Sequence, residues 1–155
     1  MIKEAEILVT ALKKKGLKFT TAESCTGGLI SGAITDVAGA SAVFDGGVCA
    51  YANRIKTALL GVPEKTLGTV GAVSAATAAA MARGARTLTG ADIAVSVTGI
   101  AGPDGGTAEK PVGTVYIAAA TAEGVLVRRY NFSGDRATIR AKTVSAALRL
   151  ALMCV

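Results

Sequence analysis

The sequence alternates short apolar, β-branched runs with longer segments of helical periodicity. This alternation is typical of α/β proteins, in which helices connect the strands of a sheet. Strands are expected over 17–21, 43–51, 92–98, 114–121 and 125–132, and helices over 3–15, 28–35, 53–60, 74–88 and 135–150. The order predicts a three-layer α/β/α sandwich with a mixed, mostly parallel five-stranded sheet. A chain of 155 residues is expected to form a single domain, 1–155.

The connections between these strands predict their directions. The first three are joined through helices, as parallel strands are. No crossover helix follows the third strand, so the fourth is expected to be antiparallel, and a tight turn at Ala122-Glu-Gly124 makes the fifth parallel again. Ligands of open α/β sheets bind at the carboxyl ends of parallel strands. We therefore expect four segments to meet there: 24–28, 51–56, 99–106 and 133–136.

The chain contains no histidine. This excludes Ser-His-Asp and Cys-His nucleophiles and histidine-based metal sites, so a general base must be Lys, Tyr, Asp, Glu or Cys. No carboxylate cluster has the spacing of metal ligands, and we expect neither a metal nor a cofactor. The cysteines form no Cys-x-x-Cys pair and are expected to be reduced, with Cys25 and Cys49 in the core and no role for Cys154.

The formal net charge of +6 favours an anionic partner. A phosphorylated small molecule is preferred over nucleic acid, because the longest basic run is Lys13-Lys-Lys15 and few aromatic residues are present to stack on bases. No apolar stretch approaches the roughly 18 residues of a membrane span, and the N-terminus lacks a signal peptide's apolar core. We expect a cytoplasmic protein without membrane or nucleic-acid partners. Formation of a homo-oligomer is compatible with the sequence.

The segment Thr21-Ala-Glu-Ser-Cys-Thr-Gly-Gly28 passes from a strand into a helix. Glycines at such a turn let backbone N–H groups approach an anion. A serine on the turn would lie beside those donors, as a nucleophile facing an oxyanion needs. The alternative is that Ser24 or Thr26 only caps the helix.

The segment Tyr51-Ala-Asn-Arg-Ile-Lys56 supplies a partner for that serine. A lysine can act as a base when burial or nearby positive charge lowers its pKa, and Ser–Lys pairs are a known variant of Ser–His pairs. The alternative is a solvated lysine on a helix surface. Because this segment and Ser24 are expected at the same edge of the sheet, a lysine base and a solvated surface lysine are about equally favoured.

Two further segments of this edge suit an anion. Thr98-Gly-Ile-Ala-Gly-Pro-Asp-Gly-Gly106 offers backbone amides that could cradle a phosphate or an oxyanion, and is otherwise a mobile hairpin loop. Phe132-Ser-Gly-Asp-Arg136 combines a helix N-terminus with an arginine, and is otherwise a capped helix with a surface arginine. Lys110 could add a cation at the rim.

Together these segments resemble the CinA C-terminal family, the nicotinamide-nucleotide amidases. Leu60-Gly-Val62, Gly71-Ala-Val-Ser74 and Lys110-Pro-Val-Gly-Thr-Val115 extend the resemblance over most of the chain. The family fold is a three-layer sandwich with a mixed sheet, similar to anticodon-binding domains. Many members carry an additional N-terminal domain associated with pyrophosphatase activity, and this chain, which begins at the amidase segment, is expected to lack that activity.

The resemblance implies hydrolysis of nicotinamide mononucleotide to nicotinic acid mononucleotide and ammonia. It implies Ser24 as the nucleophile, Lys56 as its base and Tyr51 as an assisting group, with backbone N–H groups near 25–28 or 98–99 holding the oxyanion. The residues it places around the substrate are Thr26, Gly27, Gly28, Asn53, Thr98, Gly99, Gly102, Asp104, Gly105, Gly106 and Arg136. The alternative function is a non-catalytic module that binds a nucleotide or phosphate with the same fold, including one related to competence or DNA damage.

Overall fold

A five-stranded sheet with the strand order β2-β1-β3-β4-β5 organises the computed structural model, which describes residues 2–155. The strands are β1 (Phe19–Glu23), β2 (Phe44–Cys49), β3 (Ile93–Gly99), β4 (Thr114–Ala120) and β5 (Val125–Asn131). β1 pairs in parallel with β2 and β3, whereas β4 is antiparallel to both β3 and β5. The predicted strand directions are therefore confirmed, and β4 runs against its neighbours.

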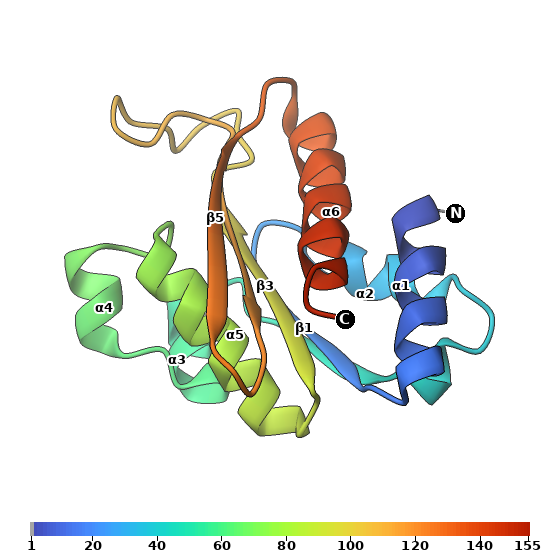
Figure 1. Cartoon of the computed structure of the whole chain (residues 1–155). Coiled ribbons are helices and arrows are strands. Elements are labelled where there is room, and N and C mark those ends of the chain that lie inside the picture. Colours follow the sequence, from blue (N-terminus) through green and yellow to red (C-terminus); the bar gives the residue numbers. More distant parts are fainter. Residues whose placement is uncertain (1) are drawn as a thin grey trace.

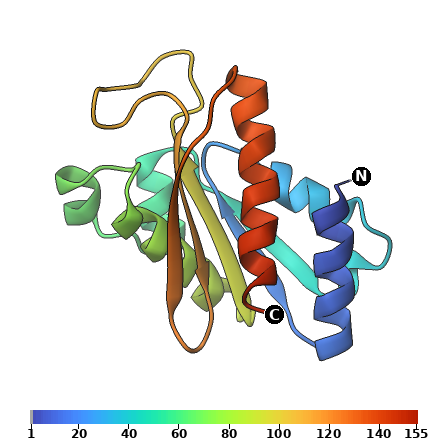
Figure 2. The same ribbon diagram turned by 45° about the horizontal axis from the view of Figure 1, so that its top comes forward.

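Helices cover both faces of this sheet (Figures 1 and 2). The helices are α1 (Lys3–Lys15), α2 (Leu29–Thr35), α3 (Asn53–Leu60), α4 (Glu64–Thr69), α5 (Ala75–Thr89) and α6 (Arg136–Leu152), with a 3₁₀ turn at Ala40–Ala42. Figure 1 shows α1, α2 and α6 on one side of the sheet and α3, α4 and α5 on the other. The predicted α/β/α sandwich is confirmed.

Alternation along the strands divides the core between the two faces. Val95 and Val97 of β3 join the larger apolar cluster under α1, α2 and α6, whereas Ala94 joins a cluster with α3 and α5. The second face is rich in alanine, so α5 packs closely. At Gly84 of α5, an added Cβ would lie 1.9 Å from the carbonyl oxygen of Leu60, so only glycine allows α3 and α5 to approach this far.

Local signals place the helix ends. Glutamates lie in the first turn of α1 and lysines in its last turn, which suits the helix dipole, and Gly16 ends the helix with φ +66°. Ser74 caps α5 by accepting the Thr77 N–H at 3.2 Å, as predicted. α4, a short helix without buried residues, was not predicted from the sequence.

Some expectations need correction. The first strand was expected over 17–21 but is β1 at Phe19–Glu23, and the second ends at Cys49 rather than at 51. The prediction that Cys49 packs in the core is wrong, because β2 lies at an edge of the sheet and its alternate side chains, including Cys49, are exposed. Within the described residues, no helix has both the length and the apolar character needed to cross a membrane.

Candidate active site

A cavity of about 300 Å³ lies where the parallel strands end. Its lining residues are Ser24, Cys25, Tyr51, Asn53, Lys56, Ala72, Val73, Thr98, Gly99, Ile100, Ala101, Gly102, Asp104, Gly105 and Arg136. Each of the four predicted segments contributes to this cavity. Ala72 and Val73, in the segment before α5, also line it and were not predicted, although they lie in the Gly71-Ala-Val-Ser74 motif.

Ser24 directly follows β1 and extends the parallel ladder. Its N–H donates to the carbonyl of Val97 in β3 at 3.0 Å, and the residue is only 8% exposed. In the described structure the Ser24 hydroxyl has no recorded hydrogen-bond partner, and it lines the cavity. The central sheet thus holds the backbone of Ser24 while its hydroxyl stays free for a ligand.

A buried carboxylate that was not among the predicted site residues organises the turn after Ser24. Glu23 is fully buried, at 0% exposure. Its carboxylate accepts hydrogen bonds from the Thr26 hydroxyl (2.6 Å), the N–H groups of Gly28 (3.0 Å), Ile30 (3.0 Å) and Ser31 (2.8 Å), and the Ser31 hydroxyl (2.8 Å). The signal in the sequence was an acidic residue just before a helix start, where negative charge is stabilised.

This arrangement places three predicted substrate residues outside the cavity lining. The Thr26 hydroxyl and the Gly28 N–H bind Glu23, and the Gly27 N–H donates to the carbonyl of Ser24 at 3.1 Å. The glycines adopt φ of +61° and +101°, which favour glycine in the turn. For the N–H groups of Cys25 and Thr26, no hydrogen bond is recorded in the described structure, so these are the donors that the turn leaves free.

Lys56 is the buried amine of the site. It lies in α3, is only 1% exposed, and donates from Nζ to the carbonyl oxygen of Tyr51 at 3.1 Å. Burial lowers the pKa of Lys56 below its ordinary 10.5. Lys56 and Ser24 line the same cavity, although no direct Nζ–Oγ hydrogen bond joins them among the described residues. The surface-lysine alternative is therefore wrong.

Arg136 links the two rims of the cavity. It is the first residue of α6, and its Nη2 donates to the Tyr51 hydroxyl at 3.0 Å while its Nη1 donates to the carbonyl of Gly102 at 2.8 Å. Tyr51 is 61% exposed. Asp135 caps α6 by accepting the Thr138 N–H at 2.8 Å. The segment is thus both a capped helix start and a cationic cavity wall.

The glycine-rich segment after β3 forms the remaining wall. Thr98 donates from its hydroxyl to the carbonyl of Ala72 at 2.8 Å, which ties β3 to the segment before α5. Gly106 lies outside the cavity lining. It packs against Val112, since a Cβ added at Gly106 would lie 2.8 Å from the backbone nitrogen of Val112. Lys110 donates to the carbonyl of Val70 at 2.9 Å and so fastens the loop to the α4 side.

The thiol of Cys25 packs in the core, as predicted. Burial raises the pKa of Cys25 to about 11, so this thiol stays protonated near neutral pH and is a poor nucleophile. Among residues 2–155, no three Cys, Asp or Glu side chains gather closely enough to hold a metal ion. Besides the Cys25 thiol, the cavity lining carries the Ser24 hydroxyl, the Lys56 amine and the side chains of Tyr51, Asp104 and Arg136.

Comparisons with known proteins show the family of this chain. A family model described as the CinA C-terminal domain matches residues 2–155. The nicotinamide-nucleotide amidohydrolase PncC of Enterobacter agglomerans is 55% identical over 143 residues, which cover 92% of this chain and 87% of that protein. A CinA-like protein of Geobacter sulfurreducens is 57% identical over 136 residues, 88% of this chain.

The chain spans about a third of the length of the CinA-like relatives, 33% in the Geobacter sulfurreducens protein. A solved structure, the competence/damage inducible protein CihA from Agrobacterium tumefaciens, is similar with a TM-score of 0.94 and 46% identity. That match covers 99% of this chain and 96% of the other. The chain therefore belongs to the CinA C-terminal domain family.

Proposed function

We propose that this protein hydrolyses the carboxamide of nicotinamide mononucleotide, giving nicotinic acid mononucleotide and ammonia. The observation that carries the proposal is a buried lysine of lowered pKa in the same cavity as a serine with a free hydroxyl. In a chain without histidine, this pair supplies the nucleophile and base that amide hydrolysis requires. The name of the PncC relative, at 55% identity, supports the substrate.

The mechanism starts at Ser24 and Lys56. A neutral Lys56 amine keeps one N–H on the carbonyl of Tyr51, and its lone pair accepts the Ser24 proton as Oγ attacks the carboxamide carbon. The N–H group of Cys25, which lines the cavity, stabilises the oxyanion. Lys56 then returns the proton to the leaving nitrogen, which departs as ammonia. Water hydrolyses the resulting ester on Ser24 and restores the enzyme.

The cationic wall holds the other end of the substrate. A guanidinium carries five N–H donors, and Arg136 uses Nη1 and Nη2 on Gly102 and Tyr51, which leaves donors for a phosphate or ribose oxygen. In this proposal the substrate also contacts side chains and backbone of the cavity lining. These are Asn53, Thr98, Gly99, Gly102, Asp104 and Gly105.

The test measures ammonia released from nicotinamide mononucleotide by the wild type and by Ser24→Ala and Lys56→Ala. Release by the wild type, with loss of about 10³-fold or more in both variants, is the expected result. A matched control is Lys142→Ala, which removes a lysine of α6 that bonds the carbonyl of Ser133 outside the cavity. A folded wild type that binds the nucleotide but releases no ammonia would identify a binding module instead.

Mass spectrometry distinguishes the nucleophile. Rapidly quenched wild-type enzyme should carry a nicotinate mononucleotide ester on the tryptic peptide that contains Ser24. Full activity in Ser24→Ala would preserve the amidase and reject this nucleophile.

A further inference from the structure

Arg140 of α6 reaches the turn that carries the proposed nucleophile. Its Nε donates to the carbonyl of Cys25 at 3.1 Å and its Nη2 to the carbonyl of Thr26 at 2.8 Å. Arg140 is half-buried and does not line the cavity. Its hydrogen bonds therefore act on the backbone of the turn and not on a ligand.

These bonds determine where the free N–H groups point. In a trans peptide the C=O and N–H of one unit point in opposite directions. The Cys25 carbonyl and the Thr26 N–H share such a unit, so Arg140 turns the Thr26 N–H away from α6. The preceding unit is fixed in a similar way, because the Ser24 carbonyl accepts the Gly27 N–H at 3.1 Å and thereby orients the Cys25 N–H.

The direction away from α6 is the side from which the base approaches. α6 packs on one face of the sheet, whereas α3, which carries Lys56, packs on the other (Figure 2). Glu23 holds the α2 side of the turn through the Gly28, Ile30 and Ser31 N–H groups. Two charged side chains thus anchor the turn and leave only its first N–H groups unpaired in the described structure.

We propose that Arg140 is a positioning residue that holds the turn after Ser24 through the Cys25 and Thr26 carbonyls, so that the Cys25 N–H at the cavity faces the oxyanion formed during amide hydrolysis. This inference rests on the proposed function. A donor that is misdirected loses transition-state stabilisation without weakening substrate binding, because the oxyanion exists only after attack. The signature of Arg140 is therefore a loss in kcat with little change in KM.

The experiment compares Arg140→Ala and Arg140→Lys with Arg149→Ala. Arg149 lies in the same helix and pairs with Glu4, away from the turn, so its removal controls for the loss of a cation from α6. With nicotinamide mononucleotide, kcat of Arg140→Ala is expected to fall about 10- to 100-fold. This loss does not exceed the fall in kcat that follows removal of a complete oxyanion donor. KM should stay within about threefold.

Arg140→Lys keeps the charge but lacks the planar fork that binds both carbonyls, and should recover less than half of the lost kcat. A low, non-denaturing concentration of guanidinium ion should partly restore Arg140→Ala and leave Arg149→Ala unchanged. Equal kcat in Arg140→Ala and Arg149→Ala would overturn the proposal. A loss of kcat that follows a lowered melting temperature, with no rescue by guanidinium, would also overturn it.

An amide NMR spectrum separates this inference from the proposed function. The ¹⁵N–¹H signals of Cys25 and Thr26 should move in Arg140→Ala and stay in place in Arg149→Ala. If the wild type releases no ammonia, the proposed amidase function is rejected, and the proposed role of Arg140 in catalysis is rejected with it. Unmoved signals in an active wild-type background reject the positioning role alone.

Discussion

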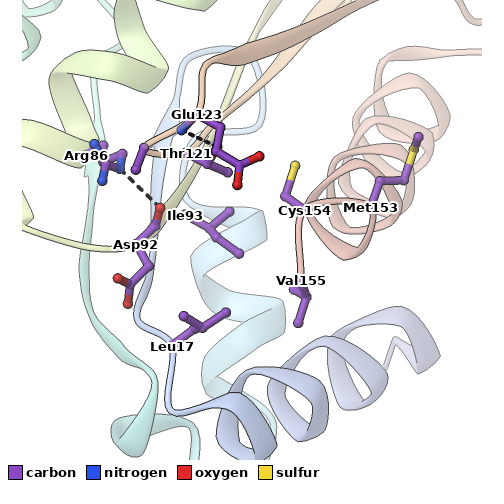
Figure 3. Close-up of a pocket in the computed structure, with 10 residues that line it drawn as sticks. Leu17, Arg86, Asp92, Ile93, Thr121, Glu123, Met153, Cys154 and Val155 are labelled. Atoms are coloured by element: carbon purple, nitrogen blue, oxygen red, sulfur yellow. Dashed lines mark hydrogen bonds between the residues drawn. The ribbon is translucent and has the colours of Figure 1, made fainter.

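The sheet has a cavity at each end of its strands, at the carboxyl edge and at the opposite edge, and the two cavities differ in character. The larger, about 430 Å³, lies at the edge opposite the proposed active site and is lined by residues that include Arg86, Asp92, Glu123 and Cys154 (Figure 3). Its polar groups bind nearby backbone: Arg86 Nε donates to the Asp92 carbonyl at 3.1 Å, and the Asp92 carboxylate accepts the Lys18 N–H at 2.7 Å. These hydrogen bonds hold together the segments that connect the helices and strands at this edge.

At the carboxyl edge the smaller cavity holds groups that the fold has left available. Lys56 is buried with a lowered pKa, and the Ser24 hydroxyl and the Cys25 N–H make no hydrogen bond within the described residues. Of these two cavities the proposed active site is the smaller, so volume does not distinguish it. Available, desolvated chemical groups distinguish a reactive site from a gap between loops.

The largest expected effect at the carboxyl edge comes from Lys56→Met. This change keeps a long unbranched chain and removes the amine, so kcat with nicotinamide mononucleotide is expected to fall about 10²- to 10⁴-fold. The melting temperature should not fall, because a buried amine that resists protonation adds little stability. Steady-state kinetics and thermal unfolding check both parts, and retention of more than about a tenth of kcat would remove Lys56 from the role of base.

The pH dependence sharpens this prediction. The neutral amine is the base, so kcat/KM is expected to rise with pH through the lowered pKa of Lys56 and level off above it. Between that lowered value and the ordinary 10.5, the unfolded chain binds the proton that the folded chain has lost. Stability should therefore rise with pH across this interval, and Lys56→Met should abolish that rise.

Glu23→Ala should give the largest loss of stability. It removes the acceptor for the Thr26 hydroxyl and the Gly28, Ile30 and Ser31 N–H groups. Each buried donor without an acceptor costs about 1–3 kcal/mol, and partial access of water limits the expected total to about 3–5 kcal/mol. Urea unfolding measures it, and a loss below about 1 kcal/mol would show that the turn does not depend on Glu23.

Arg136→Ala should act on substrate binding. A charge-assisted hydrogen bond contributes about 1.5–3 kcal/mol, so KM for nicotinamide mononucleotide is expected to rise about 10- to 100-fold. Nicotinamide riboside, which lacks the phosphate, provides the control. If Arg136 binds the phosphate, its removal should leave the kinetics of the riboside nearly unchanged, whereas equal losses with both compounds would place Arg136 elsewhere on the substrate.

The smallest effect is expected from Glu123→Gln at the opposite edge. Glu123 is exposed in the turn between β4 and β5, so kcat/KM should stay within about twofold and stability within about 0.5 kcal/mol. The same assays used for Lys56 measure this variant. A tenfold loss of activity would break the contrast between the edges and make the larger cavity part of the function.

Much of this fold follows from local sequence signals. Helical connections and the Ala122-Glu-Gly124 turn predicted the strand directions, and those directions placed Ser24, Lys56 and Arg136 at one edge. Alternation did not reveal whether β2 is central or at an edge, so Cys49 was misplaced. α4 lacks an apolar face and gave no periodic signal.

Parts of the site depend on contacts between distant segments. The Thr26–Gly28 segment looked like an anion cradle, but Glu23 and Ser24 occupy the Thr26 hydroxyl and the glycine N–H donors. Arg140 is 115 residues from Cys25 in the sequence. No local pattern reveals that contact, because it depends on α6 packing against β3, β4 and α2 in the folded protein.

The contacts of α6 also give the site an order of assembly during synthesis. Ser24 and Lys56 leave the ribosome well before Arg136 and Arg140, which reach back to Gly102, Tyr51, Cys25 and Thr26. Chains elongate at about 5–20 residues per second, so the nascent protein carries its serine and lysine for several seconds without these two arginines. A ribosome-bound chain arrested before α6 would hold an unfinished cavity, and only translation of the final helix would complete it.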